Sequence, residues 1–255
     1  MIELRDLSRA YGLHRAVEGL DLRVDSGEFL VLAGLSGSGK TTTLSMINRL
    51  VEPTGGAVLI DGVDVRARDP VALRREIGFV FQDTGLFPHM TVAENVGIVP
   101  KLLGRRARTS DIPTSDELLV LVRLDPARVR AAYPSALSGG ERQRVGVARA
   151  LAARPRIMLM DEPFGAIDAP TRDELSADYR RIHERLGLTT VMVTHDMTEA
   201  MLLADRIALM RAGRLVQVGT PRELLAAPAD DFVRSMVETP RRRARALAAL
   251  EARNA

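Results

Sequence analysis

The chain alternates between short, nearly continuous apolar runs and longer segments in which apolar residues recur at helical spacing. Apolar runs of this length predict strands that are buried on both faces. The runs are Phe29–Ala33, Ile77–Phe81, Ile157–Met160 and Val191–Thr194, while Leu20–Val24 alternates as a half-buried strand does. The helical segments are Thr41–Leu50, Arg142–Ala153, Thr171–Leu186 and Met197–Leu203. Buried strands that alternate with helices predict an α/β fold, a parallel sheet with helices on both faces.

The stretch from about residue 84 to residue 134 has a different pattern. It contains no run that predicts a buried strand, and Leu118, Leu119, Leu121 and Val122 share one face of a predicted helix. Residues Gly104–Thr109 form a charged stretch typical of a loop. We therefore predict a mostly helical insertion in the α/β domain.

Composition narrows the class of protein. The chain has 255 residues, of which 46% are hydrophobic and 27% charged, as in an ordinary globular protein of one or two domains. It contains no cysteine, which excludes disulfides, Cys-zinc sites and thiol catalysis. The 36 basic and 33 acidic residues give a net charge of +3, so the balance does not indicate a nucleic-acid partner. The first residues lack a signal-peptide core, and no apolar run approaches the ~18 residues that a membrane-spanning helix needs.

Residues Gly34–Thr41 match the phosphate-loop pattern G-x-x-x-x-G-K-[ST] between a predicted strand and a predicted helix. The glycines let successive backbone N–H groups face a phosphate, and the helix adds its positive N-terminal end. Lys40 would hold the β- and γ-phosphates, and the Thr41 hydroxyl would bind Mg²⁺. The pattern predicts that ATP is bound by Gly34, Ser36, Gly37, Ser38, Gly39, Lys40, Thr41 and Thr42.

A carboxylate pair follows a second predicted strand. The run Ile157–Met160 ends in Asp161 and Glu162. Asp161 is placed to hold Mg²⁺ through its water shell, and Glu162 to polarise an attacking water as a general base. A strand that ends in two carboxylates is by itself often structural, but downstream of a phosphate loop it indicates nucleotide hydrolysis.

The segment Leu137–Glu141 reads Leu-Ser-Gly-Gly-Glu and precedes a predicted helix, so Ser138 and Gly140 would form a hydroxyl and N–H cluster suited to an anion. Here the sequence resembles the ATP-binding-cassette (ABC) family, whose signature is L-S-G-G-Q or a close variant. The resemblance implies a P-loop NTPase fold of the ABC type, with an N-terminal antiparallel β subdomain and a helical insertion at about residues 84–150. It also implies that Ser138, Gly139, Gly140 and Glu141 face the ATP held by a second copy, in a head-to-tail dimer.

Further site residues are implied by the same resemblance. Tyr11, in a loop after the first strand, would stack on adenine. Gln82 would contact Mg²⁺ and the attacking water and link the core to the insertion. Asp168 belongs to a loop that crosses the dimer interface, and His195 would reach the γ-phosphate. The implied catalytic set is Lys40, Gln82, Glu162 and His195, and the implied metal set is Thr41, Gln82 and Asp161.

The sequence departs from the family pattern at Leu35, where Pro is common, at Ile167, where Leu is usual, and at Glu141, where Gln is commoner. None of these changes removes a phosphate donor, a metal ligand or the base. Glu141 places a negative charge near the signature, so nucleotide affinity is the property that this departure is expected to affect.

Within the family, several stretches resemble the ATPase subunit of quaternary-amine importers, which carry glycine betaine, choline, carnitine or proline betaine. These stretches are Thr42–Leu50, Gly85–Asn95, Val99–Leu102 and Asp231–Arg234. The resemblance covers residues 1–237 as one ATP-binding domain. It implies two permease subunits and an extracytoplasmic binding protein as partners, a place at the cytoplasmic face of the inner membrane, and no nucleic acid. Aromatic and apolar residues would line a groove for a permease helix, or be ordinary core: Phe79, Phe81, Leu86, Phe87 and Pro88.

Alternatives remain at this point. The chain could instead be the ATPase subunit of an importer for another small solute, such as a polyamine, methionine or an amino acid. A soluble ABC ATPase that does not act in transport is a less favoured alternative. Residues 238–255 carry an arginine cluster and a helical pattern, which predicts a solvated basic tail or a contact with anionic lipid. Many members of the importer group continue into paired cystathionine-β-synthase-type domains, whereas this sequence ends at Ala255, which predicts a short form without these domains.

Overall fold

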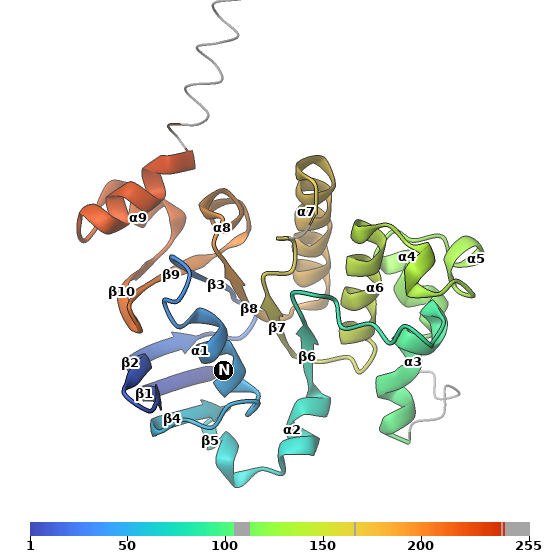
Figure 1. The fold of residues 1–255 in the computed structure, drawn as a ribbon, viewed down its shortest axis with the longest axis horizontal. Coiled ribbons are helices and arrows are strands. Elements are labelled where there is room, and N and C mark those ends of the chain that lie inside the picture. The colour runs from blue at the N-terminus through green and yellow to red at the C-terminus, as the bar shows by residue number, and fades with distance from the viewer. Residues whose placement is uncertain (105–112, 166, 241, 243–255) are drawn as a thin grey trace, which may run out of the picture.

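The computed structural model describes residues 1–104, 113–165, 167–240 and 242, which form two sheets and a group of helices (Figure 1). The strands are β1 Ile2–Tyr11, β2 His14–Val24, β3 Phe29–Ala33, β4 Gly55–Ile60, β5 Val63–Asp64, β6 Ile77–Val80, β7 Ile157–Asp161, β8 Thr189–Thr194, β9 Arg206–Arg211 and β10 Arg214–Gly219. The helices are α1 Lys40–Ile47, α2 Pro70–Glu76, α3 Val92–Leu102, α4 Ser115–Leu121, α5 Pro126–Val129, α6 Gly139–Leu151, α7 Ala169–Leu186, α8 Met197–Leu203 and α9 Pro221–Ala226, with short 3-10 turns at Val65–Ala67 and Pro134–Ala136.

The larger sheet has the strand order β10-β9-β3-β8-β7-β6. Its strands run parallel from β9 to β6, and every residue of β3 and β8 is buried. The predicted α/β fold is therefore confirmed. At the other edge, β10 pairs antiparallel with β9, which the prediction of a parallel sheet did not include. A tight turn at Ala212 and Gly213, both with positive φ, reverses the chain there.

The carboxyl ends of the central strands meet at one edge of this sheet. Ala33 of β3 lies opposite Thr194 of β8, and Asp161 of β7 lies opposite Val193. The loops that leave these strands therefore start side by side, which is where open α/β sheets bind ligands.

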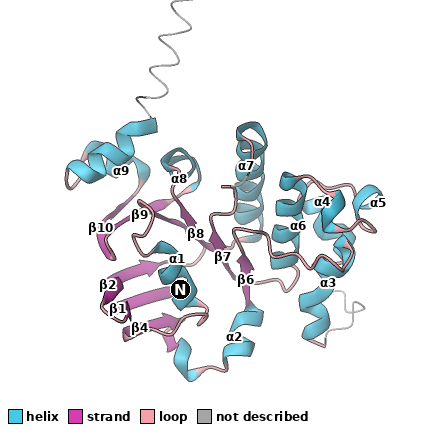
Figure 2. Cartoon of the chain, viewed as in Figure 1, coloured by secondary structure: helices cyan, strands magenta, loops and turns pink. Residues whose placement is uncertain are grey.

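The two faces of the larger sheet have different covers (Figure 2). One core cluster joins the sheet to α6, α7 and α8. On the other face, a second cluster joins it to α1 and to the four-stranded sheet β2-β1-β4-β5, which is antiparallel. The predicted antiparallel β subdomain is thus present, and it takes the place of most of the helices expected on that face.

Between β6 and β7 the described residues form helices and turns without a strand. Thr91, Thr114 and Ser138 each cap a helix through a capping box with a glutamate three residues later. Of the four residues predicted to share one helical face, Leu118, Leu119 and Val122 are buried and Leu121 is partly buried. Of the predicted loop Gly104–Thr109, only Gly104 is described, and the limits of residues 84–150 for the insertion stay a prediction.

The C-terminal part packs beside β9 and β10. Helix α9 is followed by a helical stretch at residues 231–240. Most of the predicted basic tail, residues 238–255, lies outside the described residues, so its role stays a prediction. Within the described ranges, no helix combines the length and apolar character required to cross a bilayer.

Candidate functional site

The loop from Gly34 to Gly39 joins β3 to α1 and requires glycine at two of its positions. Gly34 has φ +150° and Gly39 has φ +97°, which favour glycine over residues with a Cβ. A Cβ on Gly34 would collide with the carbonyl oxygen of Met210, and one on Gly39 with that of Ala16. The loop therefore lies directly against two neighbouring strands, and its backbone is fixed before any ligand arrives.

Lys40 is held inside this loop. Its Nζ donates to the carbonyl oxygens of Gly34 at 2.8 Å and Leu35 at 2.9 Å. Burial lowers the pKa of Lys40, while the nearby carboxylates Glu162 and Asp161 raise it in part. A buried ammonium whose partners are mainly carbonyl dipoles is well prepared to accept an anion such as a phosphate.

The two oxygen donors predicted for magnesium are in contact. The Thr41 hydroxyl donates to Asp161 Oδ1 at 2.9 Å, across 120 positions of sequence. Burial is the main cause that raises the pKa of Asp161, and the Thr41 hydrogen bond opposes it. One hydroxyl and one carboxylate fit Mg²⁺, which takes few protein ligands and keeps several waters. Among the described residues, no group of three or more His, Cys, Asp or Glu side chains could hold a metal.

Glu162 and His195 form a second pair at the same edge. His195 Nδ1 lies 3.0 Å from Glu162 Oε2. Glu162 has φ +43°, a left-handed conformation, and its N–H donates to the Val193 carbonyl at 3.0 Å. The side chain of Glu162 is 21% exposed and that of His195 is 59% exposed, so both can meet a solute at the loop.

A pocket of about 310 Å³ lies over the phosphate loop. Its lining includes eight residues predicted to bind ATP, namely Tyr11, Ser36, Gly37, Ser38, Gly39, Lys40, Thr41 and Thr42, and also the predicted base Glu162. Tyr11 is the last residue of β1 and not a loop residue as expected, because it pairs with His14 across the β1–β2 turn. His14 and Ala16 also line the pocket, and the sequence analysis missed both. The position of His14 opposite Tyr11 in a hairpin was the signal that could have found it.

The signature residues Ser138 to Glu141 do not line this pocket, and they sit at the start of α6 in the helical part (Figure 1). The Ser138 N–H donates to Glu141 Oε2 at 2.8 Å, and the Glu141 N–H donates to Ser138 Oγ at 3.2 Å. A Cβ on Gly140 would press into Thr171 of α7 at 2.7 Å. Glu141 also pairs with Arg128 of α5, and this arginine is the main cause of the lowered pKa of Glu141. The negative charge of Glu141, which distinguishes this signature, is therefore balanced by Arg128.

Other predicted site residues are also absent from the pocket lining, namely Gly34, Gln82, Asp161, Asp168 and His195. Gln82 is exposed in the turn after β6. Asp168 is exposed and caps α7 by accepting from the Thr171 N–H at 3.1 Å.

A separate groove of about 310 Å³ lies between β6, α3 and the end of α1. Phe79, Phe81 and Phe87 line it as predicted, whereas Leu86 and Pro88 do not; Leu86 packs against the core instead. Arg149 of α6 borders the groove and donates to the carbonyl oxygens of Thr84 and Gly85, each at 2.6 Å. It thereby ties the helix that follows the signature to the turn that contains Gln82.

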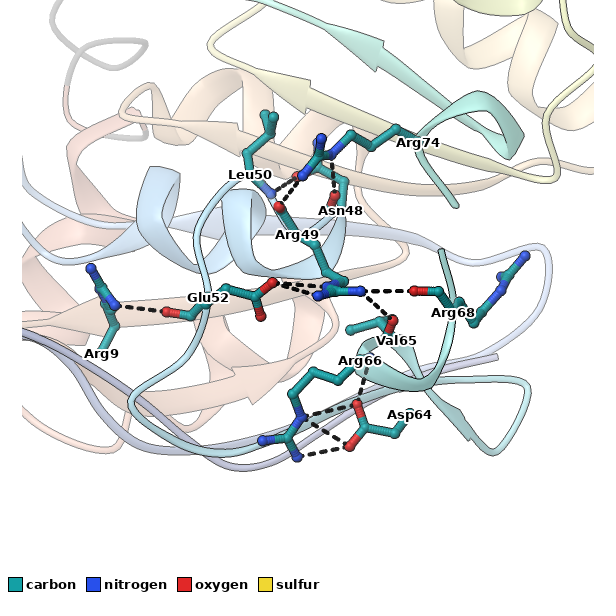
Figure 3. Close-up of polar contacts among 10 residues, drawn as sticks. All are labelled: Arg9, Asn48, Arg49, Leu50, Glu52, Asp64, Val65, Arg66, Arg68 and Arg74. Atoms are coloured by element: carbon teal, nitrogen blue, oxygen red, sulfur yellow. Dashed lines mark hydrogen bonds and ion pairs between the residues drawn. The ribbon is translucent and has the colours of Figure 1, made fainter. Parts of the chain in front are cut away.

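The rim of the groove is also tied to the phosphate-binding helix (Figure 3). Asn48, directly after α1, borders the groove together with Arg74 of α2. Arg74 donates to the Asn48 carbonyl at 3.2 Å. Arg49 donates to the Arg68 carbonyl at 2.8 Å and pairs with Glu52 at 2.7 Å. Helix α1 therefore carries Lys40 at one end and a fixed part of the groove at the other.

Comparisons with known proteins agree with this arrangement. A family model described as ABC transporter matches residues 17–165. The chain is 50% identical over 238 residues to a glycine betaine/carnitine/choline transport ATP-binding protein, OpuCA of Bacillus subtilis (strain 168), covering 93% of this chain and 62% of that protein. It is 50% identical over 235 residues to a glycine betaine uptake system ATP-binding protein, YehX of Escherichia coli (strain K12), covering 92% and 75%. The chain thus spans about three fifths of the length of the first of these relatives.

A solved structure is similar over most of the fold. It is a dimeric ATP-binding cassette in a post-hydrolysis state, bound to ADP and phosphate. The TM-score is 0.76 at 33% sequence identity, and the match covers 86% of this chain and 98% of the other.

Proposed function

Because this chain belongs to the ABC transporter family, we propose that it is the ATP-hydrolysing subunit of an importer for quaternary amines such as glycine betaine, choline or carnitine. The printed names of its relatives supply the cargo class, and their likeness extends over more than nine tenths of this chain. The observation that carries the catalytic part is the meeting of Thr41 with Asp161 and of Glu162 with His195 beside the phosphate loop.

Glu162 is the base of the proposed hydrolysis. Its carboxylate accepts a proton from the attacking water, and the hydrogen bond to His195 holds the carboxylate in one orientation. His195, which is exposed beyond Glu162, then contacts the γ-phosphate. Lys40 already lies among carbonyl dipoles, so a bound phosphate gains a cation with little rearrangement.

Thr41 and Asp161 would hold Mg²⁺ at the end of β7, with Gln82 as a further ligand. When bound, this ion neutralises charge on the phosphate oxygens. Until then, the hydrogen bond between Thr41 and Asp161 keeps the two donors adjacent. Tyr11, which is 46% exposed at the pocket, would take the adenine ring on its face.

A second copy of the chain completes the site. Ser138, Gly139 and Gly140 begin α6, whose capped N-terminus presents N–H groups to an anion. They do not line the pocket of their own chain, so the γ-phosphate they contact is held by the partner. The loop that ends at Asp168 would cross the same two-fold interface.

Two permease subunits would bind the groove beside Phe79, Phe81 and Phe87, one on each copy of the chain. Arg149 connects this groove to the helix behind the signature, and the Arg49–Arg74 network connects it to α1. Both halves of the site are therefore connected to the groove, so closure of the dimer can move the surface that binds the permease. The complex would place this subunit at the cytoplasmic face of the membrane, with a substrate-binding protein on the far side.

Uptake of labelled glycine betaine tests this proposal in host cells that lack the chain. We expect the wild-type chain to restore uptake under osmotic stress, and Glu162→Gln, expressed at the same level, to fail. Unchanged uptake by the deletion strain would contradict the assigned cargo. Rescue by Glu162→Gln would contradict the role of hydrolysis.

A further inference from the structure

Arg172, one turn into α7, contacts two loops of the site at once. Its Nη2 donates to the Ile167 carbonyl oxygen at 2.9 Å, in the loop that ends at Asp168. Its Nη1 lies 3.5 Å from Asp196 Oδ2, directly after His195. The guanidinium thus bridges the loop assigned to the dimer interface and the loop that carries the histidine.

Asp196 is itself tightly placed. Its Oδ1 accepts from the Thr198 N–H at 2.7 Å and caps α8, while its own N–H donates to the Thr194 hydroxyl at 3.0 Å. Because His195 lies between Thr194 and Asp196, a movement of the Asp196 carboxylate rotates the backbone that carries His195. The ion pair between Arg172 and Asp196 can therefore affect the position of His195 relative to Glu162.

The surroundings favour an arginine at this position. Glu199 of α8 is buried, and the charge of Arg172 acts to lower its pKa, which burial raises. The Nε of Arg172 is buried without a hydrogen-bond partner. A planar guanidinium can hold a carbonyl and a carboxylate through separate nitrogens, whereas a lysine ammonium would reach one of them.

We propose that Arg172 is a positioning residue that transmits docking of the second copy on the Asp168 loop to His195. The inference rests on the proposed function, because it needs a dimer that closes over ATP. When the partner presses on this loop, the Ile167 carbonyl moves, and Arg172 draws the Asp196 carboxylate and His195 with it.

The test compares Arg172→Met with Arg181→Met in the purified full-length chain. Arg181 lies on the same helix, and its ion pair with Asp178 is 58% exposed on the arginine side. Asp178 also pairs with Arg144 and Arg123, so the control leaves no carboxylate unpaired. We expect Arg172→Met to lower kcat about tenfold, or ~1.4 kcal/mol, with KM within about twofold of the control. In a Glu162→Gln background, Arg172→Met should still form a dimer with ATP.

A kcat of Arg172→Met within about twofold of the control would overturn the inference. A loss of ATP-dependent dimerisation would also overturn it, since Arg172 would then act on docking and not on His195. If Arg172→Met does not fold, Asp196→Asn provides the test, because asparagine keeps the helix cap while it removes the charge. A normal kcat of Asp196→Asn would contradict the inference. Absence of turnover in wild type and control alike would instead contradict the proposed function.

Discussion

The phosphate-loop half and the signature half of the proposed site are prepared in different ways. In the first, the residues come from three separate strand ends, and Thr41 already contacts Asp161 while Glu162 contacts His195. In the second, Ser138 and Glu141 contact each other through a capping box, as at three other helix starts among the described residues. In our proposal the first half supplies the catalytic groups, whereas the second contacts ATP only in a second copy of the chain.

This difference separates binding from turnover. The phosphate-loop half should bind ATP in a monomer, because its donors are fixed by the backbone. The signature half should matter only when two copies meet. Variants in the two halves should therefore fail at different steps.

The largest effect is expected for Glu162→Gln. The amide keeps the shape of the carboxylate but cannot accept the water proton, so kcat should fall by about 10²–10⁴-fold. Binding of a fluorescent ATP analogue should change little, since Glu162 does not hold the phosphates. A steady-state ATPase assay with a parallel binding titration checks both, and wild-type turnover would rule out Glu162 as the base.

Ser138→Ala tests the other half against a matched cap. It should lower turnover about hundredfold through loss of the contact with the partner's ATP, while ATP binding to the monomer stays intact. Thr114→Ala removes an equivalent capping box on α4, away from the site, and should cost a similar ~1 kcal/mol of stability with normal turnover. Equal turnover losses in the two variants would mean that Ser138 acts only as a cap.

Glu199→Gln tests a buried carboxyl group of α8, the helix that follows His195. Burial raises the pKa of Glu199 to about 7, so its contribution to stability is full below the unfolded pKa near 4.5 and is lost as pH rises to about 7. Glutamine carries no charge, so the variant should be more stable than wild type at pH 8 by on the order of 1–3 kcal/mol, and the gain should fade toward pH 4.5. Denaturant unfolding across this pH range measures it, and a pH-independent difference would contradict the burial argument.

The smallest effect concerns the balanced charge in the signature. Arg128→Ala should weaken ATP affinity in the dimer about three- to fivefold, because Glu141 would face the nucleotide with its charge uncompensated. Adding Glu141→Gln should restore the affinity. Arg130→Ala, which breaks a similarly exposed ion pair with Asp116, is the control and should have no effect on KM. Failure of the double variant to recover would separate Arg128 from Glu141.

The sequence predicted the central strands well because buried parallel strands leave continuous apolar runs. Phe29–Ala33 coincides with β3, and the predicted strand at Ile77 differs from β6 only at its end. Edge strand β10 has only one buried residue, its last, so its apolar pattern is weaker, and its antiparallel direction depends on a turn at Ala212 and Gly213.

The site was predictable where one motif places its residues on one loop, as at Lys40 and Thr41. It was less so where neighbours come from another sheet. Ala16 reaches the pocket only because β2 packs beside the phosphate loop, and no local pattern encodes that contact. For Leu86 the sequence left a groove wall and the core as alternatives, because hydrophobicity alone does not distinguish them; the structure places it against the core.

The central claim is that ATP is held between the phosphate loop of one copy and the signature of another. Sedimentation of Glu162→Gln chains that also carry Lys40→Ala or Ser138→Ala tests it most directly. The account predicts that neither double variant dimerises alone with Mg-ATP, and that an equimolar mixture does, because one intact composite site forms between them. A mixture that stays monomeric while Glu162→Gln alone dimerises would show that the two halves must lie in the same chain, and would contradict the account.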